Sequence, residues 1–103
     1  MNRFGRDEPL PSQMQGCWTG IDDPLSELVV NGGRITYLGS EVIYDHKVIR
    51  EEDGALSVTL GIDDEARMDT FQRENITGLV ITPENRFVVY NVRFALECIR
   101  PLD

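Results

Sequence analysis

The side chains best suited to holding a small molecule are three tyrosines, the single histidine and two neutral polar residues. They are Tyr37, Tyr44, Tyr90, His46, Thr70 and Gln72. Tyr44 and His46 are two positions apart, so in a strand both point to the same face of the sheet. Hydroxyl, imidazole and amide groups donate and accept hydrogen bonds without requiring a full charge. On apolar walls they predict an internal pocket for a small, partly apolar molecule.

Catalysis is an alternative function for the same residues. His46 would act as the acid or base, with Tyr44 as its partner, in a small isomerase or cyclase that needs no cofactor. A lone histidine in a strand is more often a hydrogen-bonded structural residue. The sequence has no serine-centred elbow, phosphate-binding glycine loop or metal-binding histidine cluster, and its acidic runs lack the spacing of a calcium loop. Neither a metal nor a cofactor is therefore expected.

Self-association is a third possible function. Ile43, Ile49 and Phe87 fall on faces that alternation assigns to the outside of the sheet. Apolar side chains left on an outer face can pair two copies of a chain. The protein would then be a homodimer.

Composition limits both the size of the fold and its partners. The chain has 103 residues, 41% of them hydrophobic, and a formal net charge of −8. This length fits one domain, and the acidic balance would repel nucleic acid and anionic membranes. No apolar run is long enough to span a membrane, and charges and prolines stand where a secretory signal would be apolar. We expect a cytoplasmic protein with neither nucleic-acid nor membrane partners.

The elements that must position these residues are short strands. Asn31-Gly32-Gly33 tolerates positive φ and predicts a tight hairpin. Residues 1–14 show no period and predict a mobile N-terminal arm, which leaves residues 15–103 as a single β-barrel domain. Further strands are expected at 42–50, 55–60, 66–74, 76–81 and 87–100. In 42–50, alternation places Tyr44 and His46 inside and Asp45 and Lys47 outside.

Residues 66–74 are the least regular of the expected strands. Either face of such a strand carries polar groups that would be costly in a dry core. One interpretation places Thr70 and Gln72 in a wet cavity beside the tyrosines and His46. The other is a short, poorly buried edge strand whose polar residues are simply solvated.

Seven or eight strands joined by hairpin turns describe an all-β, antiparallel up-and-down meander. Curling such a sheet until the first strand meets the last removes both exposed edges. A closed barrel is therefore favoured, with a two-sheet sandwich as the alternative.

The stretch around the only tryptophan resembles a known signature. Gly16-x-Trp18 on the first strand of the barrel domain and Arg100 at the end of the last strand resemble the calycin group, which includes lipocalins and streptavidin-like barrels. Residues 16–100 also resemble a small family of uncharacterised bacterial proteins with a streptavidin-like barrel. The resemblance implies that Trp18 plugs one end of the barrel and that Arg100 packs across its ring. A single tryptophan argues against a biotin cage.

Overall fold

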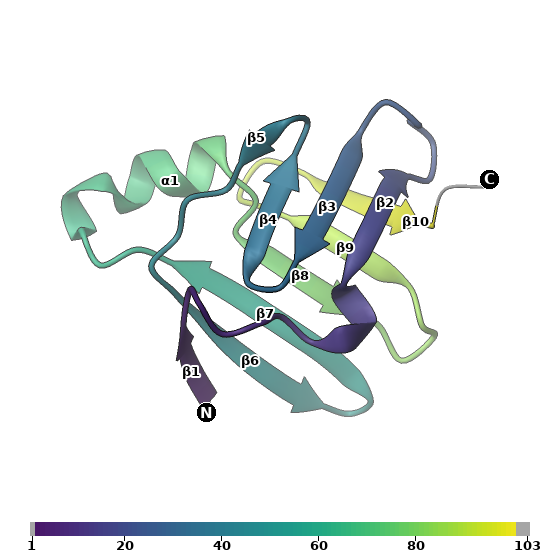
Figure 1. Cartoon of the computed structure of the whole chain (residues 1–103), viewed down its shortest axis with the longest axis horizontal. Coiled ribbons are helices and arrows are strands. Elements are labelled where there is room, and N and C mark those ends of the chain that lie inside the picture. The colour runs from purple at the N-terminus through teal and green to yellow at the C-terminus, as the bar shows by residue number, and fades with distance from the viewer. Residues whose placement is uncertain (1, 101–103) are drawn as a thin grey trace.

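The computed structural model describes residues 2–100; Met1 of the expected arm and residues 101–103 of the expected barrel domain lie outside the described residues. It contains ten strands and one short helix (Figure 1). The strands are β1 (Asn2–Gly5), β2 (Gly16–Gly20), β3 (Glu27–Asn31), β4 (Arg34–Tyr37), β5 (Ser40–Glu41), β6 (His46–Glu52), β7 (Ala55–Gly61), β8 (Gly78–Ile81), β9 (Phe87–Tyr90) and β10 (Ala95–Ile99), and the helix is α1 (Met68–Glu74). No helix within residues 2–100 has the length and apolar character needed to cross a bilayer.

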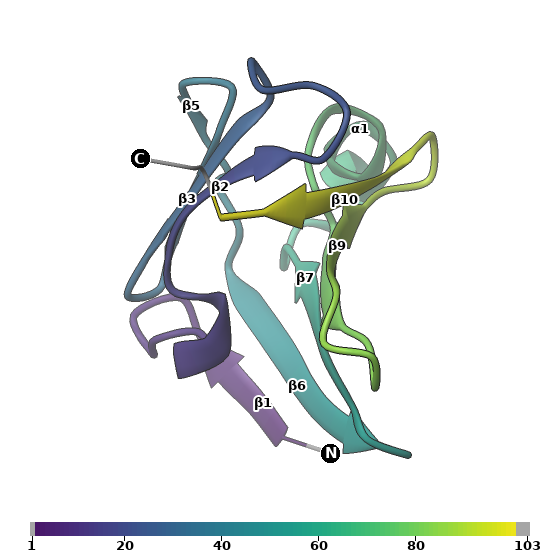
Figure 2. The same cartoon turned by 90° about the vertical axis from the view of Figure 1, so that its right-hand side faces the viewer.

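All ten strands belong to one antiparallel sheet in the order β1-β6-β7-β8-β9-β10-β2-β3-β4-β5. The sheet curls into a half-barrel, with β2 and β3 facing β7 and β9 across the interior (Figure 2). The all-β prediction is confirmed. The expected closed barrel of seven or eight strands is not what the strand order shows, because β1 and β5 are its two ends. β5 has only two residues and the chain bends at Asp45, so pairing does not continue from β5 to β6.

Residues 2–5 of the expected arm form a strand. β1 pairs with β6, with Asn2 opposite Ile49 and Gly5 opposite His46. This pairing occupies the edge of β6 that a closed barrel would have used to meet β5. The N-terminal segment is therefore part of the sheet.

The hairpin predicted at Asn31-Gly32-Gly33 is confirmed. β3 and β4 pair with Asn31 opposite Arg34, and Gly32 has a φ of +62°. Gly33 is needed for a different reason: a side chain there would collide with the backbone carbonyl oxygens of Arg6 and Glu8. The N-terminal segment can therefore press directly against the hairpin.

The concave face of the sheet is filled by apolar side chains. Leu28, Val58, Leu79 and Val89 are fully buried there. Burial of a side chain of this size stabilises a fold by roughly 1.5–3 kcal/mol. Phe87 was expected on an outer face, but it is part of this core and only 2% exposed. Ile49, also expected outside, is partly buried against the core. Of the three residues expected to support a dimer, only Ile43 is well exposed, at 56%.

Residues 66–74, expected to be a strand, are helical. A 3-10 turn spans Glu65–Arg67, and α1 follows it at once. The Asp64 carboxylate accepts a hydrogen bond from the backbone N–H of Ala66, which satisfies one of the unpaired donors at a helix start. Phe71 provides the buried contact of α1, and Asp69 and Arg73 form an ion pair one turn apart. The prediction of a polar strand was wrong because these local helix signals outweigh alternation.

The contact expected between Trp18 and Arg100 is confirmed. β10 pairs with β2, and the Arg100 guanidinium lies 3.8 Å from the centre of the Trp18 ring. The indole N–H donates to the Met14 carbonyl oxygen at 3.0 Å, and the Phe87 ring packs edge-on against Trp18. A side chain at Gly16 would collide with the Arg100 guanidinium. Trp18, Phe87 and Arg100 therefore form one packed cluster beside the β2–β10 pair.

Candidate anion-binding site

Tyr44 and His46 lie in different surroundings. Tyr44 is 1% exposed, and its hydroxyl donates to the Gly33 carbonyl oxygen. His46 lies at the surface, where its Nδ1 is 3.2 Å from the Asp63 carboxylate and 3.3 Å from the Arg3 guanidinium. The bend at Asp45 ends the alternation that would have placed both side chains on one face.

The other residues expected in the internal pocket are also dispersed. Tyr37 on β4 stacks against Phe94 with 6.2 Å between ring centres, and the Tyr90 ring covers Gly78. Thr70 and Gln72 are on α1, where Thr70 lines a surface cavity of about 270 Å³. The structure does not gather the six residues around one cavity.

A buried lysine lies beside Tyr44 instead. Lys47 is fully buried, although alternation assigned it to the outer face. Its amine donates to the backbone carbonyl oxygens of Gly5 at 2.7 Å, Arg6 at 3.5 Å and Glu8, and it lies 3.3 Å from the Tyr44 hydroxyl. The prediction for Lys47 was wrong because the bend before β6 shifts the phase of the strand.

Burial changes the acidity of both groups. It lowers the pKa of the Lys47 amine, and the nearby carboxylates of Glu8 and Asp7 only partly oppose this. Burial also raises the pKa of the Tyr44 hydroxyl, against the smaller effect of the Arg6 guanidinium. Lys47 is thus a cation held mainly by backbone carbonyl oxygens.

Gln15 and Leu10 hold the tip of the β3–β4 hairpin. The Gln15 amide donates to the Gly32 carbonyl oxygen at 2.8 Å and accepts from the Gly32 N–H at 2.8 Å. The Leu10 N–H also donates to the Gly32 carbonyl oxygen, at 2.9 Å. We call residues 5–15 and their contacts to Gly32, Gly33, Tyr44 and Lys47 the side-chain seam. Here side chains rather than strand pairing join the N-terminal segment and β6 to the β3–β4 hairpin.

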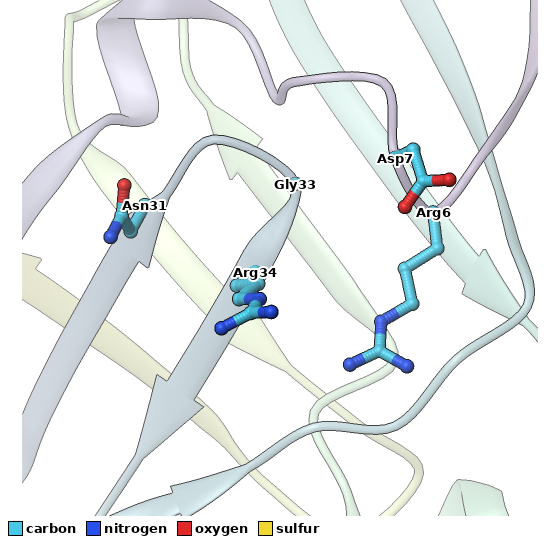
Figure 3. Close-up of a pocket in the computed structure, with 5 residues that line it drawn as sticks. All are labelled: Arg6, Asp7, Asn31, Gly33 and Arg34. Carbon is cyan, nitrogen blue, oxygen red and sulfur yellow. The ribbon is translucent and has the colours of Figure 1, made fainter.

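A cavity of about 430 Å³ opens on the side-chain seam, lined by Arg6, Asp7, Asn31, Gly33 and Arg34. Figure 3 shows Arg6 and Asp7 coming from the N-terminal segment, and Asn31 and Arg34 from the β3–β4 hairpin. The close approach permitted by Gly33 brings these two segments together. The cavity therefore depends on the tertiary fold.

The charged groups of this cavity differ in how they are paired. Arg6 forms an ion pair with Glu41 on β5, and both side chains are 36% exposed. Within residues 2–100, Arg34 has no carboxylate at ion-pairing distance. Guanidinium groups bind carboxylates and phosphates through paired N–H donors, and the Asn31 amide adds both a donor and an acceptor. The arrangement is suited to a small polar anion.

Sequence reasoning missed this site. Arg6 lies in the expected N-terminal arm, and alternation along the strand after the hairpin predicts Arg34 on an outer face, but neither prediction indicates a site. Arg34 directly after the hairpin glycines was a weak signal, since it marks a charge beside a close backbone approach. No local pattern indicates that Arg6 reaches the same place.

The part of the chain from residue 2 to residue 100 holds no group of three or more His, Cys, Asp or Glu side chains arranged to bind a metal ion. No protein-family model, no curated protein and no solved structure matches the chain.

Proposed function

We propose that this protein binds a small anionic molecule in the cavity lined by Arg6 and Arg34. The observation that carries the proposal is the convergence of two guanidinium groups from separate segments on one cavity. This keeps the small-molecule binding expected from the sequence, but moves the site from the interior of a barrel to the side-chain seam. A streptavidin-like family and a cytoplasmic location remain parts of the proposal.

Charge supports a local and selective site. The protein carries a net charge of −8, so its surface as a whole repels anions. An anion would be retained only where several donors converge at short range. Hydrogen bonds to charged groups contribute about 1.5–3 kcal/mol each, which is enough to hold a small ligand against this repulsion.

The test is a calorimetric titration of the wild type and Arg34→Gln with glycolate, glycine and inorganic phosphate at low ionic strength. Loss of one charged contact should weaken binding about tenfold or more. Arg50→Gln, an exposed arginine on β6, is the matched control and should bind as the wild type does. Equal affinity in Arg34→Gln, or no binding of any probe by the wild type, would overturn the proposal.

A second candidate is acid–base catalysis at His46. The Asp63 carboxylate at 3.2 Å from Nδ1 is placed to orient the imidazole, a role that Tyr44 cannot fill from the core. His46→Ala would then abolish turnover of a ligand without abolishing its binding. Unchanged turnover in His46→Ala would exclude this candidate.

A further inference from the structure

We propose that Glu41 is an internal occupant of the anion site: its carboxylate holds the position on Arg6 that the carboxylate of a ligand takes. The inference rests on the proposed function and names its ligand class, a small polar monocarboxylate. It also makes Glu41 an inhibitory contact that each ligand must displace.

Strand register places Glu41 on the same face of the sheet as Arg34. Glu41 lies opposite Thr36 in the β4–β5 pair, and directly opposite residues project to the same side of a sheet. Thr36 shares that side with Arg34, while Ile35 between them is buried. The Glu41 carboxylate therefore reaches Arg6 across the outer face, beside Arg34.

The Arg6–Glu41 ion pair lies where a ligand can displace it. β5 is a two-residue strand at the end of the sheet, held by two residue pairs to β4. Both side chains of the Arg6–Glu41 pair are about a third exposed, so solvent and solutes reach it. Ion pairs of this kind are weak, at about 0–1 kcal/mol. Glu41 can therefore leave Arg6 while the β sheet stays intact.

Charge balance selects the ligand. With Glu41 in place, the positive charges of Arg6 and Arg34 are matched by the negative charges of Asp7 and Glu41. Displacement of Glu41 leaves one net positive charge, which suits a monoanion better than a dianion. The Asp7 carboxylate and the Asn31 amide can accept hydrogen bonds from hydroxyl or ammonium groups of the ligand. Hydroxy acids and amino acids fit this description.

The deciding variant is Glu41→Gln, titrated with glycolate and glycine beside the wild type. Removal of the competing ion pair should tighten binding about two- to fivefold. Glu84→Gln, an exposed glutamate in the β8–β9 turn, changes the net charge equally and should leave affinity unchanged. Inorganic phosphate, largely a dianion at pH 8, should bind more weakly than glycolate.

Glu41→Asp distinguishes the direct contact of the carboxylate with Arg6 from the effect of a negative charge on β5. It keeps the charge on β5 but shortens the side chain, so it should also tighten binding if the contact with Arg6 is what competes. Wild-type binding that depends on Arg34 but is not tightened by either substitution would overturn the inference and leave the proposed function standing. No binding by the wild type or either variant would overturn the proposed function itself.

Discussion

Two joints hold the curled sheet together, and they are built differently. At the first, β10 pairs with β2 through the backbone, and Trp18 fills the space beneath with Phe87 and Arg100 around it. We call this the strand-paired seam. At the side-chain seam, the Lys47, Tyr44 and Gln15 side chains donate hydrogen bonds to backbone carbonyl oxygens of the N-terminal segment and of the β3–β4 hairpin.

The difference explains why the cavity lies where it does. Strand pairing uses up the backbone donors and acceptors and packs apolar side chains beneath them. The side-chain seam instead brings the N-terminal segment against the tip of the β3–β4 hairpin, and the polar side chains of both remain outside the core. Arg6 and Arg34 line one cavity there for this reason.

Trp18→Ala should have the largest effect and tests the contribution of the strand-paired seam to stability. Truncation of a buried tryptophan should lower the free energy of unfolding by about 3–5 kcal/mol. The loss should be global, because Trp18 packs against the core that most of the strands share. Urea denaturation followed by far-UV circular dichroism measures it, and Phe94→Ala, a half-exposed ring, should lose much less. Equal losses would show that Trp18 has no special place at the strand-paired seam.

Lys47→Met should have a smaller and more local effect. Methionine keeps much of the volume but leaves the backbone carbonyl oxygens of the N-terminal segment without their donor, which costs about 1–3 kcal/mol. Hydrogen exchange should accelerate at the Leu10 amide, whose acceptor lies on the hairpin, before it accelerates at Val89 in the core. Arg50→Met on the same strand is the control, expected within about 0.5 kcal/mol of the wild type. Equal acceleration of hydrogen exchange at the Leu10 and Val89 amides would mean that the two seams open together.

Alkaline pH should act on the two seams in opposite directions. Burial raises the pKa of the Cys98 thiol on β10 from 9.0 to about 11. The unfolded chain loses this proton first, so the stability contributed by Cys98 falls as pH rises from 9 to about 11, by about 2 kcal/mol. The lowered pKa of Lys47 has the opposite sign: the unfolded chain keeps its proton longer, and stability rises toward pH 10.5.

Unfolding of Cys98→Ala between pH 8 and pH 11 isolates the first effect. This variant should lose part of the alkaline decline, whereas Cys17→Ala, which removes an exposed thiol, should keep it. An unchanged slope in Cys98→Ala would show that the thiol is not shielded at the strand-paired seam.

Sequence patterns predicted the parts of this fold whose causes are local. The hairpin at Asn31-Gly32-Gly33 follows from residues that tolerate positive φ. The pairing of β2 with β10 follows from the expectation that the first and last strands of the domain meet, and the Trp18–Arg100 contact was expected from a resemblance rather than from a local pattern. Helix α1 was within reach of the same reasoning, since Asp64 is a helix cap and the segment after it is rich in good helix formers.

The candidate site could not be predicted in this way. A single bend at Asp45 reversed the assignment of Lys47, and alternation cannot detect a bend. The meeting of Arg6 and Arg34 requires β1 to pair with β6 and Gly33 to admit the backbone of Arg6. Both of these contacts join segments that are far apart in the chain, so no local sequence pattern predicts them.

The sequence separation between the residues joined at each seam also influences the order in which the molecule folds. The Arg100–Gln15 bond joins residues 85 positions apart, and the Lys47–Gly5 bond joins residues 42 positions apart. Contacts between distant residues require closure of a large loop before they contribute free energy, and they slow folding. The β3–β4 and β6–β7 hairpins should therefore form first and the strand-paired seam last. The anion site depends on the shorter of these two closures, so its residues would come together before the strand-paired seam forms.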